Sequence, residues 1–286
     1  MLRYREDLRS LVFIGISLVL LTLDFTKPIG WISFLLVPLS CVFFYICFTI
    51  NHNQLHLGIF KTNWANILTN ILLSLCTGVP VTMIYLPHVQ NHHPNPCTKN
   101  DWSGAHLAEG YQGIWRAIVY VFRAQIAPMK LRPRSPFSGL TSYRKISFLL
   151  ESLALGTFFL YGLIAHPGSF FLHVVLPWFI SVNILVLVNF ALHDGCDYES
   201  EKNHFYTFTS KIGNYFLLNN GYHLAHHEKP GMHWSLLPEF YNNSIKPTCC
   251  IDHEKVSILK HLRLMYLFIP NVSKYKVISE KTEQKS

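Results

Sequence analysis

"SLALGTFFLYGLIAHPGSFFLHVVLPWFISVNILVLVNFALH", residues 152–193, is a run of 42 residues that contains no Asp, Glu, Lys or Arg. One membrane-spanning helix needs about 20 apolar residues. Extended back to about residue 146, the run is long enough for two spans. Its tetrapeptide "HPGS", residues 166–169, is the expected break because Pro and Gly interrupt helices. The stretch therefore predicts a hairpin of two transmembrane helices.

The composition of the whole chain agrees with a membrane protein. Of its 286 residues, 50% are hydrophobic and only 14% are charged, whereas soluble domains carry about 25% charged residues. The net charge of +8 does not indicate a nucleic-acid partner, because the basic residues form no binding stripe. We therefore expect the lipid bilayer, and no nucleic acid, as a partner.

A second hairpin is expected at the N-terminus. Residues 11–25 and 31–50 are apolar and are separated by the turn "TKPIGW". The first of these segments resembles a signal peptide, but it lacks an A-x-A-like cleavage site and follows Glu6 and Asp7. We interpret it as a retained first helix.

The apolar segment 64–87 is expected to return to the side from which it starts. It contains Gly78 and Pro80, and histidines stand at both of its ends, with His56 before it and His88 after it. A simple crossing would place those two histidines on opposite faces of the membrane. If they act together, the segment is re-entrant or interfacial; a buried helix of the soluble type is the alternative.

Together these segments predict an all-α integral membrane protein with two transmembrane hairpins, about four spans, and a cytosolic helical cap. The N-terminus, residues 51–145 and the chain from 193 then lie on one side, which holds 23 of the 24 Lys and Arg residues. The positive-inside rule makes that side, with both termini, cytosolic. Residues 110–134 read as an interfacial helix or as a cytosolic helix packed on other loops. Residues 1–240 form the predicted membrane domain, and 241–286 a cytosolic C-terminal tail.

Four groups of metal-ligand side chains follow apolar segments on this same predicted face. Two of them, "HNQLH" and "NFALH", place their polar residues four positions apart, on one face of a helix. Neighbouring histidines on a helix project about 100° apart, so that each can serve a different metal. The groups are His52 and His56; His88, His92 and His93; Asn189 and His193; and His223, His226 and His227.

Nine histidines and one asparagine are about as many ligands as two metal ions with five or six ligands each require. Imidazole suits Zn, Cu, Fe and Ni. No thiolate accompanies the groups, which argues against structural zinc. A nitrogen-rich site beside lipid, without an evident hydrolytic partner, favours oxygen chemistry with iron.

The boxes H-x3-H, H-x3-HH and H-x2-HH, in this order around two hairpins, resemble those of the integral-membrane fatty acid desaturase and hydroxylase superfamily over about residues 10–240. The resemblance implies that the nine histidines bind two Fe2+ ions. It also implies that Asn189 acts through a metal-bound water or from just outside the ligand set. The implied reaction is reductive activation of O2 and removal of hydrogen from an unactivated C–H bond. Loss of a second hydrogen gives a double bond, and oxygen rebound gives an alcohol.

The resemblance implies an acyl-lipid, acyl-CoA or acyl-carrier substrate and an external electron donor, such as ferredoxin, rubredoxin or cytochrome b5 with a reductase. A fatty acyl desaturase is the first hypothesis. The second is a lipid or carotenoid hydroxylase or ketolase, because the second box has three intervening residues where many acyl desaturases have two. The stretch "HHEKPGMHWSLLP" is also similar to the last box of carotenoid ketolases.

A hypothesis from another class is a membrane zinc hydrolase or a receptor-like protein that uses the same histidines. Zinc without iron, and no dependence on O2 or reductant, would distinguish it. Asp194, Asp197 and Glu228 adjoin the histidines and could orient their rings. His233 is more often a packing residue in such a position than a ligand.

Overall fold

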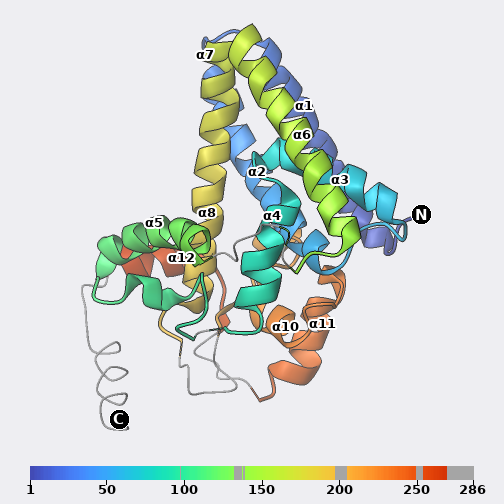
Figure 1. Cartoon of the computed structure of the whole chain (residues 1–286). Helices are drawn as coiled ribbons and strands as arrows, with labels where there is room; N and C mark the ends of the chain where they lie inside the picture. Colours follow the sequence, from blue (N-terminus) through green and yellow to red (C-terminus); the bar gives the residue numbers. More distant parts are fainter. Residues whose placement is uncertain (97, 132–136, 138, 197–204, 249–253, 269–286) are drawn as a thin grey trace.

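Four long apolar helices form the body of the computed structural model, which describes residues 1–96, 98–131, 137, 139–196, 205–248 and 254–268. They lean together at one end, near α7 (Pro167–Ser169), and diverge toward the opposite end, where the remaining elements gather (Figure 1). α2 (Ser33–His56) packs along both α1 (Leu8–Thr26) and α8 (Leu176–His193). These helices are long and apolar enough to cross a membrane, and the two predicted hairpins are confirmed. The four candidate spans are Arg5–Thr26, Ser33–His56, Ser142–Ala165 and Pro167–His193.

The break in the decisive stretch lies where the sequence predicts it. Helix α6 (Ser142–Ala165) ends at His166, and the next span begins with Pro167 at its first position. Proline is suited to that position because its missing N–H is not needed there. The span continues through the π-helical turn η4 (Phe170–Val175) into α8 (Leu176–His193).

The segment between the hairpins is a bent pair of helices. α3 (Asn63–Thr77) is followed by α4 (Val81–Tyr85), which runs on into the π-helical turn η2 (Leu86–His92), and the two arms meet at 89°. Gly78 ends α3 with a φ of 72°, a left-handed conformation that favours glycine. The bend brings η2 back to the end of α2 (Ser33–His56), as expected for a re-entrant segment.

A buried carboxylate on α6 holds this bend. Glu151 Oε2 accepts a hydrogen bond from the backbone N–H of Thr82 at 2.9 Å, and Oε1 accepts one from the Thr82 hydroxyl at 2.7 Å. Ser147 donates to Oε1, and it accepts from Asn70 on α3 at 3.0 Å. Glu151 therefore satisfies the backbone at the start of α4 and links both arms of the bend to a spanning helix.

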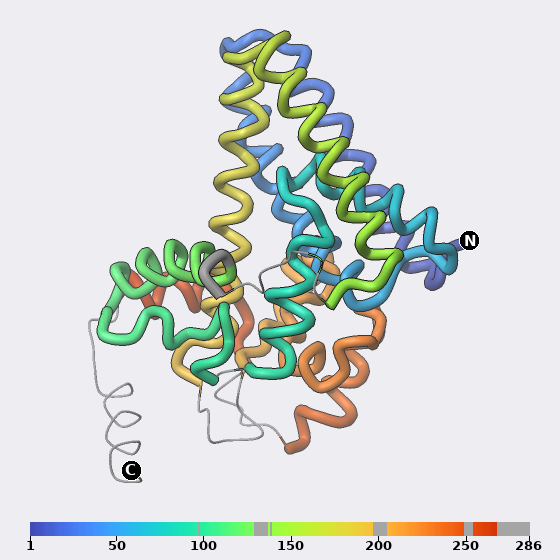
Figure 2. Tube along the Cα trace, in the orientation of Figure 1, coloured from blue at the N-terminus to red at the C-terminus, as the bar shows by residue number. Residues whose placement is uncertain are grey.

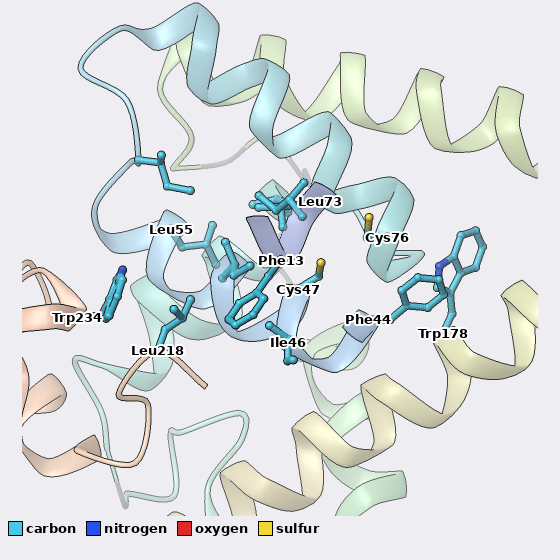
Figure 3. Packing of buried hydrophobic residues seen from close by; sticks show 14 of the residues in the cluster. Phe13, Phe44, Ile46, Cys47, Leu55, Leu73, Cys76, Trp178, Leu218 and Trp234 are labelled. Carbon is cyan, nitrogen blue, oxygen red and sulfur yellow. The ribbon is translucent and has the colours of Figure 1, made fainter. Parts of the chain in front are cut away.

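The hydrophobic core continues from the spans into the cap. Phe44 and Cys47 of α2 pack with Leu73 of α3 and Trp178 of α8 (Figure 3). Trp234, from the C-terminal third of the chain, belongs to the same buried cluster. The cap is thus fixed to the spans by apolar packing, not only by the histidines.

The cap consists of one long helix and several short elements at the open end of the helix bundle (Figure 2). Its two-residue strands are parallel, with Thr207 opposite Glu254. The division of the chain at residue 240 stays a prediction. The elements in chain order are η3 (Ala105–Ala108), α5 (Gly113–Leu131), β1 (Thr207–Phe208), α9 (Lys211–Phe216), α10 (His223–Glu228), η5 (Trp234–Leu236), α11 (Leu237–Phe240), η6 (Tyr241–Ile245), β2 (Glu254–Lys255), α12 (Ile258–Leu262) and η8 (Arg263–Phe268).

Candidate metal centre

The first two histidines come from the end of α2, which continues six residues beyond the predicted residue 50. His52 and His56 stand one turn apart on this helix, with ring centroids 5.3 Å apart. The continuous helix carries the histidines out of the bilayer-crossing bundle without a loop. A rigid element of this kind holds ligands more accurately than a loop does.

The second group lies on the π-helical turn η2, which accommodates the extra residue of the box. A π-turn joins residues five apart instead of four, and the His93 N–H accordingly donates to the His88 carbonyl oxygen at 3.1 Å. His88 and His93 therefore point to the same place, with their Nε2 atoms 3.1 Å apart. The ring of His92 does not join this pair. The three residues between His88 and His92 therefore do not prevent His88 and His93 from converging.

The remaining histidines come from the end of α8 and from α10. His193 closes α8, and its Nε2 lies 2.9 Å from Nε2 of His223 at the start of α10. The turn before α10 places Leu218 and Asn219 at φ values of 48° and 57°. Phe205 stacks on the ring of His227, with centroids 4.2 Å apart. The end of the apolar stretch 152–193 and the "HLAHH" motif, residues 223–227, thus meet at one point.

The structure brings all nine predicted histidines together in two adjoining groups. Within each group, one ligand-type atom from every residue lies within 4.8 Å of the others. Both adjacent pairs are divided between the groups, as their helical positions predict, and the rings of His93 and His227 stack across the boundary at 4.4 Å. The groups are His52, His56, His88, His93 and His226, and His92, His193, His223 and His227.

The spacing of the ring nitrogens fits metal ligands at right angles. Nitrogens about 2.1 Å from one metal stand about 3.0 Å apart at right angles and about 3.4 Å apart in a tetrahedron. Four Nε2–Nε2 separations within the groups are 2.9, 3.0, 3.1 and 3.2 Å. These values lie in the range that imidazoles converging on one metal ion would give, closest to right angles.

Buried ring nitrogens without a hydrogen-bond partner provide a second test of the fit. Such atoms are rare in proteins, because an unpaired buried polar atom costs free energy. Nε2 of His92 and Nε2 of His227 are both buried and have no hydrogen-bond partner in the described structure. Each nitrogen is on a ring that belongs to the second group. A metal ion would satisfy both.

The electrostatics keep the imidazoles of α10 in the form that binds metals. Burial, followed by the nearby rings of the centre, lowers the pKa of His223, His226 and His227 well below the usual value. Each therefore carries a free lone pair at neutral pH. Neutral imidazole is the ligand form of histidine.

Asp101 is the functional residue that sequence reasoning missed. Its Oδ2 lies 2.8 Å from Nδ1 of His92, and both side chains are buried. This contact fixes the His92 tautomer with the proton on Nδ1 and leaves Nε2 free for a metal. Asp101 stands in a loop after the second box, with no spacing that relates it to the other boxes.

Asn189 does not stand among the close imidazole contacts but is held beside them. Its Nδ2 donates to the Tyr120 hydroxyl at 3.0 Å, and that hydroxyl donates to the Ser103 carbonyl at 2.6 Å. Burial raises the Tyr120 pKa, which keeps the phenol protonated. Asn189 is thereby fixed in orientation one turn before His193, with its amide oxygen left available.

The acidic residues beside the boxes take different places. Asp194 is buried and accepts three hydrogen bonds from Arg116, at 2.7, 3.0 and 3.2 Å, and one from the Tyr266 hydroxyl at 3.0 Å. Glu228 is exposed, and Asp197 lies outside the described residues. His233 is a packing residue: it stacks on Tyr4 at 4.0 Å and contacts Asp7 at 3.1 Å.

The comparison with known proteins follows this geometry. One family model, described as fatty acid desaturase, matches residues 29–251, a range that contains every predicted site residue. No curated protein and no solved structure matches the chain. The matched family consists of membrane oxidoreductases with lipid substrates, and it is known for di-iron centres. Because the match spans well over half of the sequence, the chain belongs to the fatty acid desaturase family.

Proposed function

We propose that this protein is an O2-dependent di-iron desaturase that introduces a double bond into a fatty acyl chain. The observation that carries the proposal is the pair of adjoining imidazole groups, with Nε2 separations of 2.9–3.2 Å and two unpartnered buried nitrogens in the second group. Two adjoining sites are needed to place two irons on one O2 molecule.

Each histidine group would hold one iron. The first would have five imidazole ligands and the second four. Asn189, held by Tyr120, would complete the second set through a bound water. The uncharged ligand set contains no thiolate, which suits iron in an oxygen-activating role better than structural zinc.

The bound irons would supply the reductive activation of O2. The balanced reaction takes two hydrogens from adjacent carbons of the chain, two electrons and two protons from outside, and one O2, and it yields one double bond and two waters. The residues of this chain keep the imidazoles neutral, fix their orientation and keep bulk water away. Asp101 holds a proton on Nδ1 of His92, so that Nε2 faces the metal.

A small apolar cavity lies beside the end of α8 that carries Asn189 and His193, although none of the nine histidines lines it. Val188 and Leu192 of α8 line it together with Phe208 and Leu217. These two α8 residues directly precede Asn189 and His193 in the chain. The cavity is small in this structure, so that an acyl chain would enter by moving its walls.

The electron donor and the membrane orientation complete the proposal. We infer that the histidine side faces the cytosol together with both termini, since nearly all Lys and Arg residues lie on that side of the two hairpins. The net charge of +8 favours an acidic donor. Ferredoxin, rubredoxin or cytochrome b5 with a reductase are such donors, and the substrate would be an acyl-lipid, acyl-CoA or acyl-carrier.

Lipid product analysis tests the function. We expect purified, iron-loaded protein in lipid vesicles, supplied with reductant, a donor and 18O2, to form unsaturated acyl chains without 18O. Chains that retain 18O would instead identify a hydroxylase or ketolase. No oxidised lipid of either kind, from protein with two irons per chain and each of the three donors, would contradict the proposal.

A matched pair of variants controls this experiment. His226→Ala removes an imidazole of the first group and should abolish the product and lower the iron content. His166→Ala removes an exposed imidazole near the end of the bundle opposite the centre and should leave both unchanged. Zinc in place of iron, in protein produced with ample iron and without any O2 dependence, would support the zinc hypothesis instead.

A further inference from the structure

The outward face of α5 is unusually apolar. Trp115 is 65% exposed, Phe122 64% and Ile126 46%; the exposed Ile118 lies between them on the same face, and Ile114, just before Trp115, is exposed as well. Residues three, four and seven positions apart on a helix share one side. None of these five residues is charged.

The two arginines of α5 donate hydrogen bonds to other parts of the protein, although Arg123 is itself exposed. Arg116 binds Asp194 and the Ala108 carbonyl, and Arg123 donates to the Leu107 carbonyl at 2.9 Å. The buried side of the helix is formed by Ala117, Tyr120 and Ala124. A helix on a water-exposed surface has the opposite arrangement, with its charges outward.

The position of α5 along α8 places it at the depth of the membrane. Gln125 Nε2 donates to Asn183 Oδ1 at 3.3 Å, and Asn183 precedes His193 by ten residues, which is about 15 Å along a helix. The span Pro167–His193 has 27 residues, about 40 Å, and the hydrocarbon layer is about 30 Å thick. The helix is thus about 10 Å longer than the hydrocarbon layer is thick. Even if all of this extra length extended beyond the layer at the His193 end, Asn183 would still lie at the level of the hydrocarbon.

We propose that α5 lies in the lipid leaflet on the histidine side, with Trp115, Phe122 and Ile126 among the acyl chains. The occupant of this face is the same bilayer that α8 crosses, because α5 packs on α8 at the level of Asn183. Figure 1 shows α5 lying across the end of α8 and not parallel to it, as an interfacial helix does.

The inner face of α5 connects this membrane contact to the candidate centre. Tyr120 binds Asn189, and Arg116 binds Asp194, which directly follows His193. The bilayer would thus support a helix that holds two neighbours of the second imidazole group. This arrangement does not depend on which reaction the centre performs.

Depth-dependent fluorescence quenching tests the proposal. Phe122→Cys and Ile126→Cys, each made in the full chain with Cys97, Cys249 and Cys250 replaced by Ser, are labelled with an environment-sensitive dye and reconstituted in vesicles. Asn242→Cys, on the exposed turn η6, is the control, and the parent chain measures background labelling. We expect lipids with spin labels on their acyl chains to quench positions 122 and 126 several-fold more than position 242.

A water-soluble quencher gives the opposite test. We expect iodide to quench position 242 several-fold more than positions 122 and 126. Equal iodide quenching at all three positions would overturn the proposal. So would cross-linking of two copies through position 122 without quenching by lipid, because a second chain would then cover this face.

Discussion

Two buried polar clusters lie at opposite ends of the same helix bundle. They differ in whether the ring nitrogens of their histidines have hydrogen-bond partners. Near the α6–α7 turn, His173 shares one ring nitrogen with Ser33 at 2.7 Å and the other with the Asp24 carbonyl at 3.0 Å. Ser40 donates to the Asp24 carboxylate at 2.6 Å. At the other end, His92 and His227 each leave a buried Nε2 without a hydrogen-bond partner in the described structure.

The partners of the ring nitrogens, and not burial, distinguish His173 from His92. His173 is as buried as His92, yet both of its nitrogens are satisfied within the protein. A metal ion cannot bind there without displacing those contacts. Unpartnered buried nitrogens are rare in proteins, and a bound metal ion would satisfy those at the open end.

The sharpest contrast is expected between His227→Ala and His173→Ala. Both remove a buried imidazole, but only the first removes an unpartnered nitrogen. We expect His227→Ala to lower iron affinity by more than about 100-fold, the upper end for outer-shell partners, and to abolish activity. Elemental analysis of the purified protein measures the iron.

His173→Ala is the matched control, and it should keep two irons per chain while unfolding at a lower temperature. If both variants retained two irons, the distinction between the two clusters would be wrong. If both lost iron, the contrast would reflect general destabilisation, and the ligand assignment of His227 would fall.

Acidification should affect the histidine groups at the open end of the bundle more than the cluster around His173 at the closed end, near the α6–α7 turn. Burial, with the rings of His92 and His52, lowers the pKa of His93 from 6.5 to about 3. Between these values the unfolded chain binds the extra proton and the folded chain does not, so stability falls as the pH drops below about 6.5. Protons also compete with the metal.

We therefore expect iron to be released as the pH falls from about 7.5 to about 5, followed by loss of folded protein. Iron release and unfolding are measured on the same samples, by a chelator dye and by circular dichroism. Full iron retention at the lower pH would argue that His93 is not a ligand.

Asp101→Asn tests how far the open end depends on orientation of its rings. The amide keeps the shape of the carboxylate but cannot fix the His92 tautomer by charge. We expect iron affinity to fall about 10- to 100-fold, with the fold intact. Glu109→Gln, an exposed acid in the same loop region, is the control and should bind iron as the parent does.

Ser33→Ala tests the closed end and should have the smallest effect. It removes one hydrogen bond to His173 and should lower the free energy of unfolding by about 1–3 kcal/mol without changing the iron content. Thermal unfolding in one detergent measures this against the parent chain. A loss of iron in this variant would couple the two clusters and break the comparison.

The sequence predicted the spans, the break at residue 166 and the convergence of the histidine boxes, because each depends on local composition and helical spacing. The sequence could not decide whether α5 is an interfacial helix or a cytosolic helix packed on other loops. That choice depends on which side of the helix makes contacts with the rest of the protein. The contact of Arg116 with a buried Asp194 settles which way that helix faces. Such a pair, 78 residues apart in the chain, leaves no periodic signal.

Asp101 and Tyr120 escaped the sequence analysis for the same reason. Each acts on a box residue through one tertiary contact, with His92 and Asn189 respectively. The role of the π-turn at η2 was also hidden, since the extra residue between His88 and His92 looked like a departure from the family pattern. The backbone absorbs it by changing its hydrogen-bond period.

The contact of Glu151 with the bend has a consequence for the order in which the protein assembles. Thr82 and Asn70 are synthesised long before α6, yet their hydrogen bonds end on Glu151 and Ser147 of that helix. Asn70 already has Gln54 of α2 as a partner, but in a nascent chain the Thr82 groups lack Glu151, and we expect the bent pair to wait at the membrane surface. Its three histidines would then reach their final place only after the second hairpin has inserted, so that iron enters late in biogenesis.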